Sequence, residues 1–96
     1  MESLFTFIMD YKGGTYISQG KGTSVKDAID RWAQSYVLPK EMGLKNRKKA
    51  QEDLRYIAEK EDLPPTPILG TRNVWCDSVI ILDDGAIINI VKTSMR

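Results

Sequence analysis

Basic side chains gather in the middle of this 96-residue chain. They are Lys40, Lys45, Arg47, Lys48 and Lys49. Clustered ammonium and guanidinium groups bind the phosphates of nucleic acids, so the cluster predicts a nucleic-acid-binding surface formed by Lys45, Arg47, Lys48 and Lys49. A solvated helix face is the simpler interpretation. No aromatic residue is interleaved with the basic ones, which argues against stacking of single-stranded bases.

The helix expected around this cluster changes sign along its length. Its later part is mostly acidic, with Glu52, Asp53, Glu59, Glu61 and Asp62. A helix dipole favours acidic residues in the first turn and basic residues in the last, so this order costs about a few tenths of a kcal/mol per exposed charge. A pattern that lowers stability hints at a use, such as binding an anionic partner.

A glycine-containing segment, residues 19–24, precedes the start of another expected helix. Backbone N–H groups at a helix N-terminus favour anions and would suit a phosphate. A phosphate-binding loop needs the spacing GxxxxGK followed by Ser or Thr, whereas here Gly22 follows Lys21 directly. The segment is therefore interpreted as a strand-to-helix connection with a capped helix start.

The remaining candidates for chemistry have simpler structural explanations. Asp83 and Asp84 are adjacent, and Asp-Gly is what a tight hairpin turn requires. Cys76 lies within an expected strand without a neighbouring base, as a structural cysteine does. The chain has no histidine, the commonest general base and metal ligand. We expect no catalytic residue, no metal site, no cofactor and no enzyme activity.

Length and composition describe one domain, residues 1–96. The net charge of +1 provides no overall field to attract nucleic acid or an anionic membrane. The one cysteine cannot form an intramolecular disulfide, and no apolar run approaches the length of a membrane span. The first residues lack the basic start of a signal peptide. We therefore expect a cytoplasmic protein without membrane association.

The chain opens with a predicted hairpin. Residues 4–11 and 15–19 are rich in β-forming side chains, and Gly13-Gly14 can adopt the positive φ that a two-residue turn needs. Phe5, Phe7, Met9 and Tyr11 would share one face, because side chains alternate along a strand. This turn would place Tyr11 opposite Tyr16.

Two helices are expected between the hairpins. The first spans Ser24–Tyr36, is capped by Thr23 or Ser24, and ends before Pro39. Its apolar positions follow helical spacing without a miss. The second runs from about residue 44 or 45 to about residue 61. Its thin apolar stripe predicts either a surface helix with one narrow line of contact or a helix less stable than the first, and it would be peripheral or flank an edge of the sheet. It is followed by a proline-rich, extended linker, residues 63–67, which suits neither a helix nor a central strand.

A second hairpin closes the chain. Asp84-Gly85 is a strong turn signal between two β-rich runs, residues 74–83 and 86–93. This turn would place Asp77 opposite Lys92. One face would carry the core, and the other is apolar enough to need partial cover. The core face consists of Trp75, Val79, Ile81, Ile88 and Ile90.

These elements predict an α+β fold in ββ-α-α-ββ order. Its sheet would have four antiparallel strands from two hairpins, with one well-packed and one peripheral helix. Edge strands in such a sheet can pair between subunits, so a homodimer would be compatible with this fold.

Residues 14–29 resemble the small HicB-like antitoxin domain. The resemblance rests on Gly14-Thr15-Tyr16, Gln19-Gly20 and the helix start Thr23-Ser24-Val25-Lys26-Asp27-Ala28-Ile29. It covers about a quarter of the chain and implies a compact α+β domain that binds a protein partner. The family's extra strand after the second strand is missing here, and its functional residues have no counterparts. The segment DYKGGTYISQ also resembles the start of a small bacterial family that implies no function.

The sequence therefore favours a small non-catalytic regulatory or protein-interaction domain that binds a protein partner or a second copy of itself. The alternative is a nucleic-acid-binding accessory protein that uses the basic start of the second helix.

Overall fold

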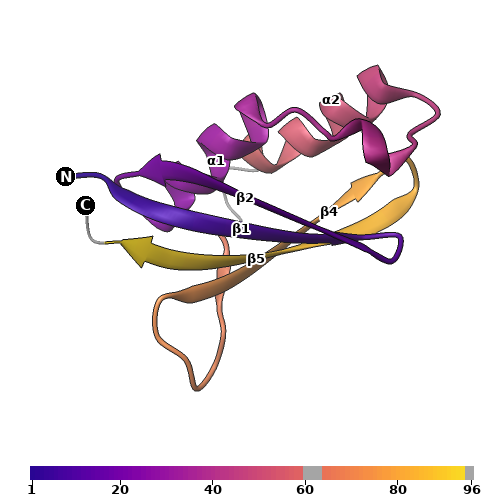
Figure 1. Ribbon diagram of the computed structural model, residues 1–96. Helices are drawn as coiled ribbons and strands as arrows, with labels where there is room; N and C mark the ends of the chain where they lie inside the picture. Colours follow the sequence, from indigo (N-terminus) through magenta and orange to yellow (C-terminus); the bar gives the residue numbers. More distant parts are fainter. Residues whose placement is uncertain (60–63, 95–96) are drawn as a thin grey trace.

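The computed structural model describes residues 1–59 and 64–94. Within these ranges the chain forms five strands, two α-helices and a short 3₁₀ helix (Figure 1). The strands are β1 (Ser3–Tyr11), β2 (Gly14–Gly22), β3 (Thr66–Pro67), β4 (Val74–Ile81) and β5 (Asp84–Ser94). The helices are α1 (Val25–Ser35), η1 (Lys40–Met42) and α2 (Arg47–Glu59). No helix in the described ranges is both long enough and apolar enough to cross a membrane.

The predicted four-stranded sheet is wrong, because the sheet has five antiparallel strands in the order β2-β1-β5-β4-β3. The additional strand comes from the segment predicted to be a linker. There, Thr66 pairs with Cys76 and Pro67 with Trp75. Proline lacks a backbone N–H but already holds an extended φ, so it is accepted at the edge of a sheet and not at its centre. Leu63, the first residue of the predicted linker, lies outside the described residues.

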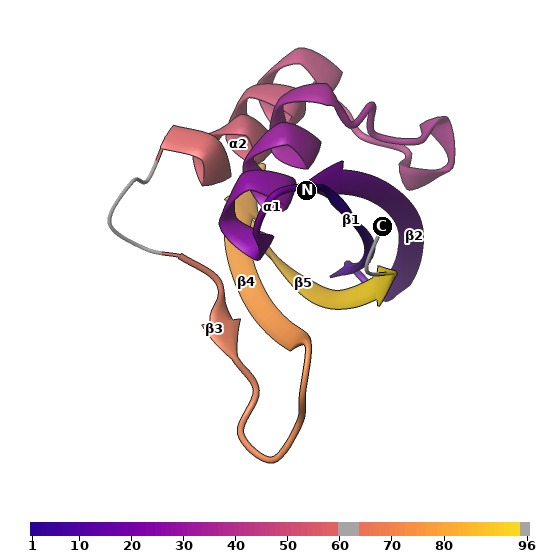
Figure 2. The same ribbon diagram turned by 90° about the vertical axis from the view of Figure 1, so that its left-hand side faces the viewer.

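The sheet curls around the core, and both helices lie on one side of it (Figure 2). The inner face of β1 supplies Phe5, Phe7, Met9 and Tyr11, which are all buried, as their alternation predicts. Trp32 of α1 stacks between Phe7 and Tyr36, with ring centroids 5.0 Å away on either side. The indole Nε1 donates to Ser18 Oγ on β2 at 2.8 Å, which ties α1 to the outer strand of the sheet.

Helix α1 confirms the prediction from sequence. Ser24 is its N-cap, and its Oγ accepts from Asp27 N–H at 3.1 Å. The Asp27 carboxylate in turn accepts from Thr23 N–H at 2.8 Å, so two backbone donors at the helix start are satisfied. The helix ends at Tyr36, three residues before Pro39.

Helix α2 begins at Arg47, slightly later than predicted, because the side chain of Asn46 caps it by accepting from Lys49 N–H at 3.0 Å. Its thin apolar stripe forms one narrow line of contact, as predicted, but this line is part of the main core and not of a separate contact. Ala50, Leu54 and Ile57 are at most 1% exposed and belong to the same core cluster as α1 and the sheet. A stripe of only a few apolar residues is sufficient when every one of them is fully buried. The predicted end near residue 61 lies outside the described residues.

Both hairpin turns lie earlier in the chain than predicted. In the first, Lys12 and Gly13 are the turn residues, with φ of 48° and 81°. Tyr11 therefore faces Gly14, and the predicted pairing of Tyr11 with Tyr16 is wrong. A Cβ on Gly14 would lie 2.6 Å from the Tyr16 hydroxyl oxygen. This glycine therefore makes room for the tyrosine ring and is not a turn residue.

In the closing hairpin, Leu82 and Asp83 form the turn and Ile81 pairs with Asp84. The predicted pair of Asp77 and Lys92 is wrong, since Asp77 faces Ile88. The shift of the turn by two residues is even, so every side chain stays on its predicted face. Val79, Ile81, Ile88 and Ile90 are buried, and Trp75 packs partly buried against them.

Candidate functional site

The basic cluster predicted to bind nucleic acid is divided between structural and exposed residues. Arg47 donates to the carbonyl oxygens of Leu38 and Pro39, and so holds the segment between the helices. The Lys49 ammonium pairs with the Asp53 carboxylate at 2.5 Å, and this raises the pKa of Lys49. Lys45 and Lys48 are exposed and form no ion pair among the described residues. Only these two of the four predicted residues are free to bind a phosphate.

The segment considered as a phosphate loop, residues 19–24, has a structural function at Gly22 and at the start of α1. A Cβ on Gly22 would lie 2.5 Å from the backbone nitrogen of Ala28, so the glycine allows α1 to pack against the end of β2. The start of α1 already holds a carboxylate, that of Asp27, whose pKa is lowered mainly by its hydrogen bond from Thr23 N–H. A phosphate would meet this negative charge, and we therefore reject the phosphate-loop interpretation.

The other candidates for chemistry are also separated. Asp84 lies 3.7 Å from the Lys12 ammonium, in an ion pair between the two hairpin turns. Asp83 is an exposed turn residue with φ of 70°. Cys76 is half-buried, and its thiol donates to the carbonyl oxygen of Asp77 at 3.7 Å. No group of three potential metal ligands forms among the described residues.

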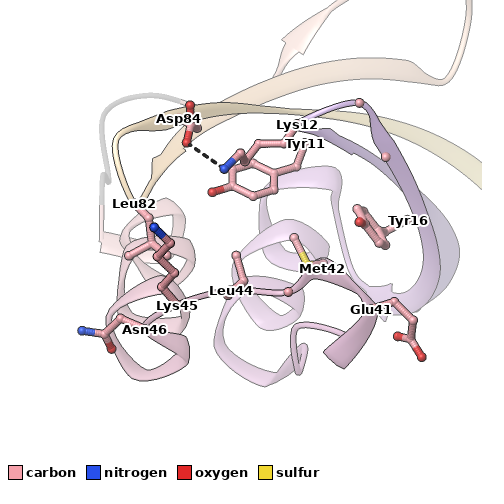
Figure 3. A pocket seen from close by; sticks show the side chains of 13 residues that line it. Tyr11, Lys12, Tyr16, Glu41, Met42, Leu44, Lys45, Asn46, Leu82 and Asp84 are labelled. Atoms are coloured by element: carbon pink, nitrogen blue, oxygen red, sulfur yellow. Dashed lines mark ion pairs between the residues drawn. The ribbon is translucent and has the colours of Figure 1, made fainter.

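One surface hollow of about 740 Å³ lies between the two hairpin turns and the segment that joins the helices (Figure 3). Tyr11 and Leu82 lie opposite Met42 and Leu44, and Lys45 comes from the segment just before α2. The Tyr11 hydroxyl is not available to a ligand, because it donates to the carbonyl oxygen of Ile81 at 2.9 Å. Burial raises the pKa of Tyr11, and the nearby carboxylates of Asp84 and Asp53 raise it further.

The charges around this first hollow are balanced. Lys12 is paired with Asp84, and Lys45 and Glu41, which lie on opposite sides of the hollow, contribute one charge of each sign (Figure 3). None of the lining side chains forms a nucleophile–base pair, and none is a buried polar group without a partner. The hollow therefore lacks the groups that would fix a substrate or a charged ligand.

A second hollow, of about 780 Å³, is a groove between α2 and the edge of β4. One wall is a continuous stripe of α2, formed by Lys49, Glu52, Asp53, Tyr56 and Glu59. The other wall comes from the closing hairpin and consists of Ser78, Val79, Ile80, Gly85, Ala86 and Ile87. Large apolar side chains are exposed here: Tyr56 by 56%, Ile80 by 62% and Ile87 by 50%. We call this hollow the α2–β4 groove.

The edge of β4 along this groove has no neighbouring strand among the described residues, because β3 pairs only with Trp75 and Cys76. Ile81 and Asp84 flank a two-residue turn and are therefore a hydrogen-bonded pair. It follows that the backbone N–H and C=O of Ile80 point away from β5 and toward the groove.

The α2–β4 groove is acidic. Asp53 accepts from Lys49 Nζ and from Leu82 N–H, the latter at 3.0 Å, and these bonds lower the pKa of Asp53. Glu52 and Glu59 form no ion pair among the described residues. With three carboxylates against one ammonium, the wall formed by α2 carries a net charge of −2.

Sequence reasoning did not find this groove. Glu52 and Glu59 were noted only as part of the acidic half of the second helix, and Tyr56 was not singled out. Ile80 and Ile87 gave the one available signal, since they lie on the sheet face expected to need a cover. The structure leaves both exposed.

A comparison with protein-family models, with curated proteins and with solved structures found no match to this chain. The resemblance of residues 14–29 to the HicB-like antitoxin domain stays a prediction.

Proposed function

We propose that this protein is a small non-catalytic interaction domain, which binds another polypeptide chain in the α2–β4 groove. The observation that carries the proposal is the meeting of exposed apolar side chains, Tyr56, Ile80 and Ile87, with the outward backbone N–H and C=O of Ile80, which have no strand partner among the described residues. Contiguous exposed apolar surface is typical of interaction sites, and a free strand edge offers backbone hydrogen bonds to an extended partner.

The outer edge of β2, at the opposite side of the sheet, is less suited to a partner. Its outward backbone positions are Thr15, Ile17, Gln19 and Lys21, of which only Ile17 is apolar. The first hollow reaches only Gly14 and Tyr16 at the start of β2, and the second does not touch this strand. Ile17 is 66% exposed and therefore resembles Ile80 in exposure without lying in a groove. It provides a matched control for experiments on Ile80 and Tyr56.

Site-specific photo-cross-linking in cells of the source organism tests the proposal. A photoreactive phenylalanine analogue replaces Tyr56 in one variant and Ile17 in another. We expect discrete protein adducts from position 56 and none, or far fewer, from position 17. Equal labelling from both positions, or no adduct from position 56, would contradict the proposal.

Nucleic-acid binding through the basic start of α2 is the second candidate, and the exposure of Lys45 and Lys48 supports it. Fluorescence anisotropy with generic DNA and RNA at low salt tests it. If wild type and a Lys45→Ala/Lys48→Ala variant show the same weak or absent binding, this candidate fails.

A further inference from the structure

The chemistry of the α2–β4 groove indicates what kind of polypeptide it accepts. This inference rests on the proposed function and specifies the partner. We infer that the groove binds an extended segment of a different protein, in which Lys or Arg side chains alternate with apolar ones, and that this segment pairs as a strand with the edge of β4.

The extended conformation follows from the backbone of β4. Ile80 directs its N–H and C=O into the groove, and these groups lack a strand partner among the described residues. A strand laid beside them would satisfy both, and its side chains would then alternate between the two sides of the sheet.

The apolar component follows from the exposed side chains. Ile80 and Ile87 lie on the outer face of the sheet, and Gly85, directly opposite Ile80, leaves open space between them, since nothing lies within 4 Å of a Cβ built there. Tyr56 is the exposed aromatic residue of the α2 wall. Alternate side chains of an added strand that lie on this face would cover Ile80 and fill the space at Gly85.

The basic component follows from charge. Lys49 is already paired with Asp53. Glu52 and Glu59 line the same wall, three and ten positions after Lys49, and form no ion pair among the described residues. The side chains on the other face of the added strand would point toward the α2 wall. Its negative charge favours ammonium or guanidinium groups there and repels carboxylates.

The same charge argues against a second copy of this chain as the occupant. Two copies joined edge to edge at β4 would bring two α2 walls of net charge −2 close together. Neither Ser78 nor Ile80 contributes a cation to compensate. A homodimer through this edge creates this repulsion, whereas a basic partner is attracted to the same wall.

Short synthetic peptides test the inference directly. The probes are KVKVKVK, its acidic counterpart EVEVEVE, and a KVKVKVK peptide methylated on alternate backbone nitrogens, which cannot pair along one edge. Fluorescence anisotropy at low salt should show KVKVKVK bound at least about tenfold more tightly than either of the others, which corresponds to about 1.4 kcal/mol. Higher salt should weaken this binding.

Two variants locate the binding. Glu52→Lys/Glu59→Lys should reverse the preference between the two charged peptides, whereas Glu41→Lys, at the first hollow, should leave it unchanged. Ile80→Pro removes the outward N–H and leaves the hydrogen bonds between β4 and β5 in place, so it should abolish binding. Ile17→Pro makes the matched change at the edge of β2 and should have no effect. Circular dichroism melts verify that each variant is folded.

Equal binding of the basic and acidic peptides, or binding unaffected by Ile80→Pro, overturns the inference. A dimer detected by light scattering and abolished by Ile80→Pro also overturns it, because the occupant is then a second copy. In both cases cross-linking from position 56 still decides the proposed function independently.

Discussion

The backbone N–H of Leu82, in the turn between β4 and β5, donates to the Asp53 carboxylate of α2 at 3.0 Å. This bond joins the two walls of the α2–β4 groove at one end. It also explains why the turn forms at Leu82-Asp83 and not at the stronger Asp84-Gly85 signal. The turn that forms leaves Leu82 half-buried against the core, with its N–H paired to α2.

Replacement of Asp53 tests this connection. Asp53→Ala removes the partner of both Leu82 N–H and Lys49, and the Asp53 side chain is only 15% exposed. We expect the free energy of unfolding to fall by about 1.5–3 kcal/mol, as for a hydrogen bond to a charged group. Glu52→Ala, one residue away and exposed, should change it by less than about 0.5 kcal/mol. Urea denaturation of the two variants measures the difference, and similar losses for both would contradict the account.

The stability should depend on pH through the same carboxylate. The pKa of Asp53 is lowered in the folded state, mainly by the Leu82 N–H and then by Lys49. A lowered pKa means that the ionised form is favoured by folding, so its contribution is complete above the unfolded pKa of about 3.9. The contribution is lost as the pH falls through the folded pKa.

We therefore expect the difference in unfolding free energy between wild type and Asp53→Asn to be constant near neutral pH and to shrink below about pH 4. Urea denaturation at a series of pH values measures it. A difference that stays constant down to the lowest pH at which the protein folds would show that Asp53 is not held in its ionised form.

Gly22→Ala tests the close approach of α1 to β2. The added methyl group would lie 2.5 Å from backbone nitrogen and 2.6 Å from Cα of Ala28, and backbone cannot move aside cheaply. We expect a loss of about 2 kcal/mol or more. Gly14→Ala meets only the Tyr16 side chain, which can rotate, so its loss should be smaller. Thermal melts of both variants measure the two losses, and equal losses would contradict this explanation of Gly22.

Lys12→Asn tests the position of the first turn. Lys12 has φ of 48°, a conformation that asparagine adopts more readily than lysine. The exposed ion pair with Asp84 contributes little, so its loss should not cancel the gain. We expect the variant to be more stable by about 0.5–1 kcal/mol. If chemical denaturation shows no gain, the turn residues would instead be Gly13 and Gly14.

The sequence predicted features that depend on local spacing. The inner face of β1, the cap at Ser24 and the end of α1 before Pro39 were all correct. In the closing hairpin the inward-facing residues were correct although the turn was not, because an even shift preserves the alternation of faces.

The features that sequence reasoning missed depend on contacts between distant parts of the chain. The turn at Leu82-Asp83 is held by Asp53, which lies 29 residues earlier. The strand at Thr66-Pro67 exists only because β4 presents an edge to it. The α2–β4 groove could not be predicted, since its two walls are brought together only by this fold.

Hydrogen exchange at one backbone amide tests the central claim most directly. The N–H of Ile80 points into the groove, and the N–H of Ile17 points outward from β2 in the equivalent way. In the presence of saturating KVKVKVK, exchange measured by NMR should slow at Ile80 by at least about tenfold and stay unchanged at Ile17. Unchanged exchange at Ile80, or equal slowing at both amides, would contradict the binding of a strand at the edge of β4.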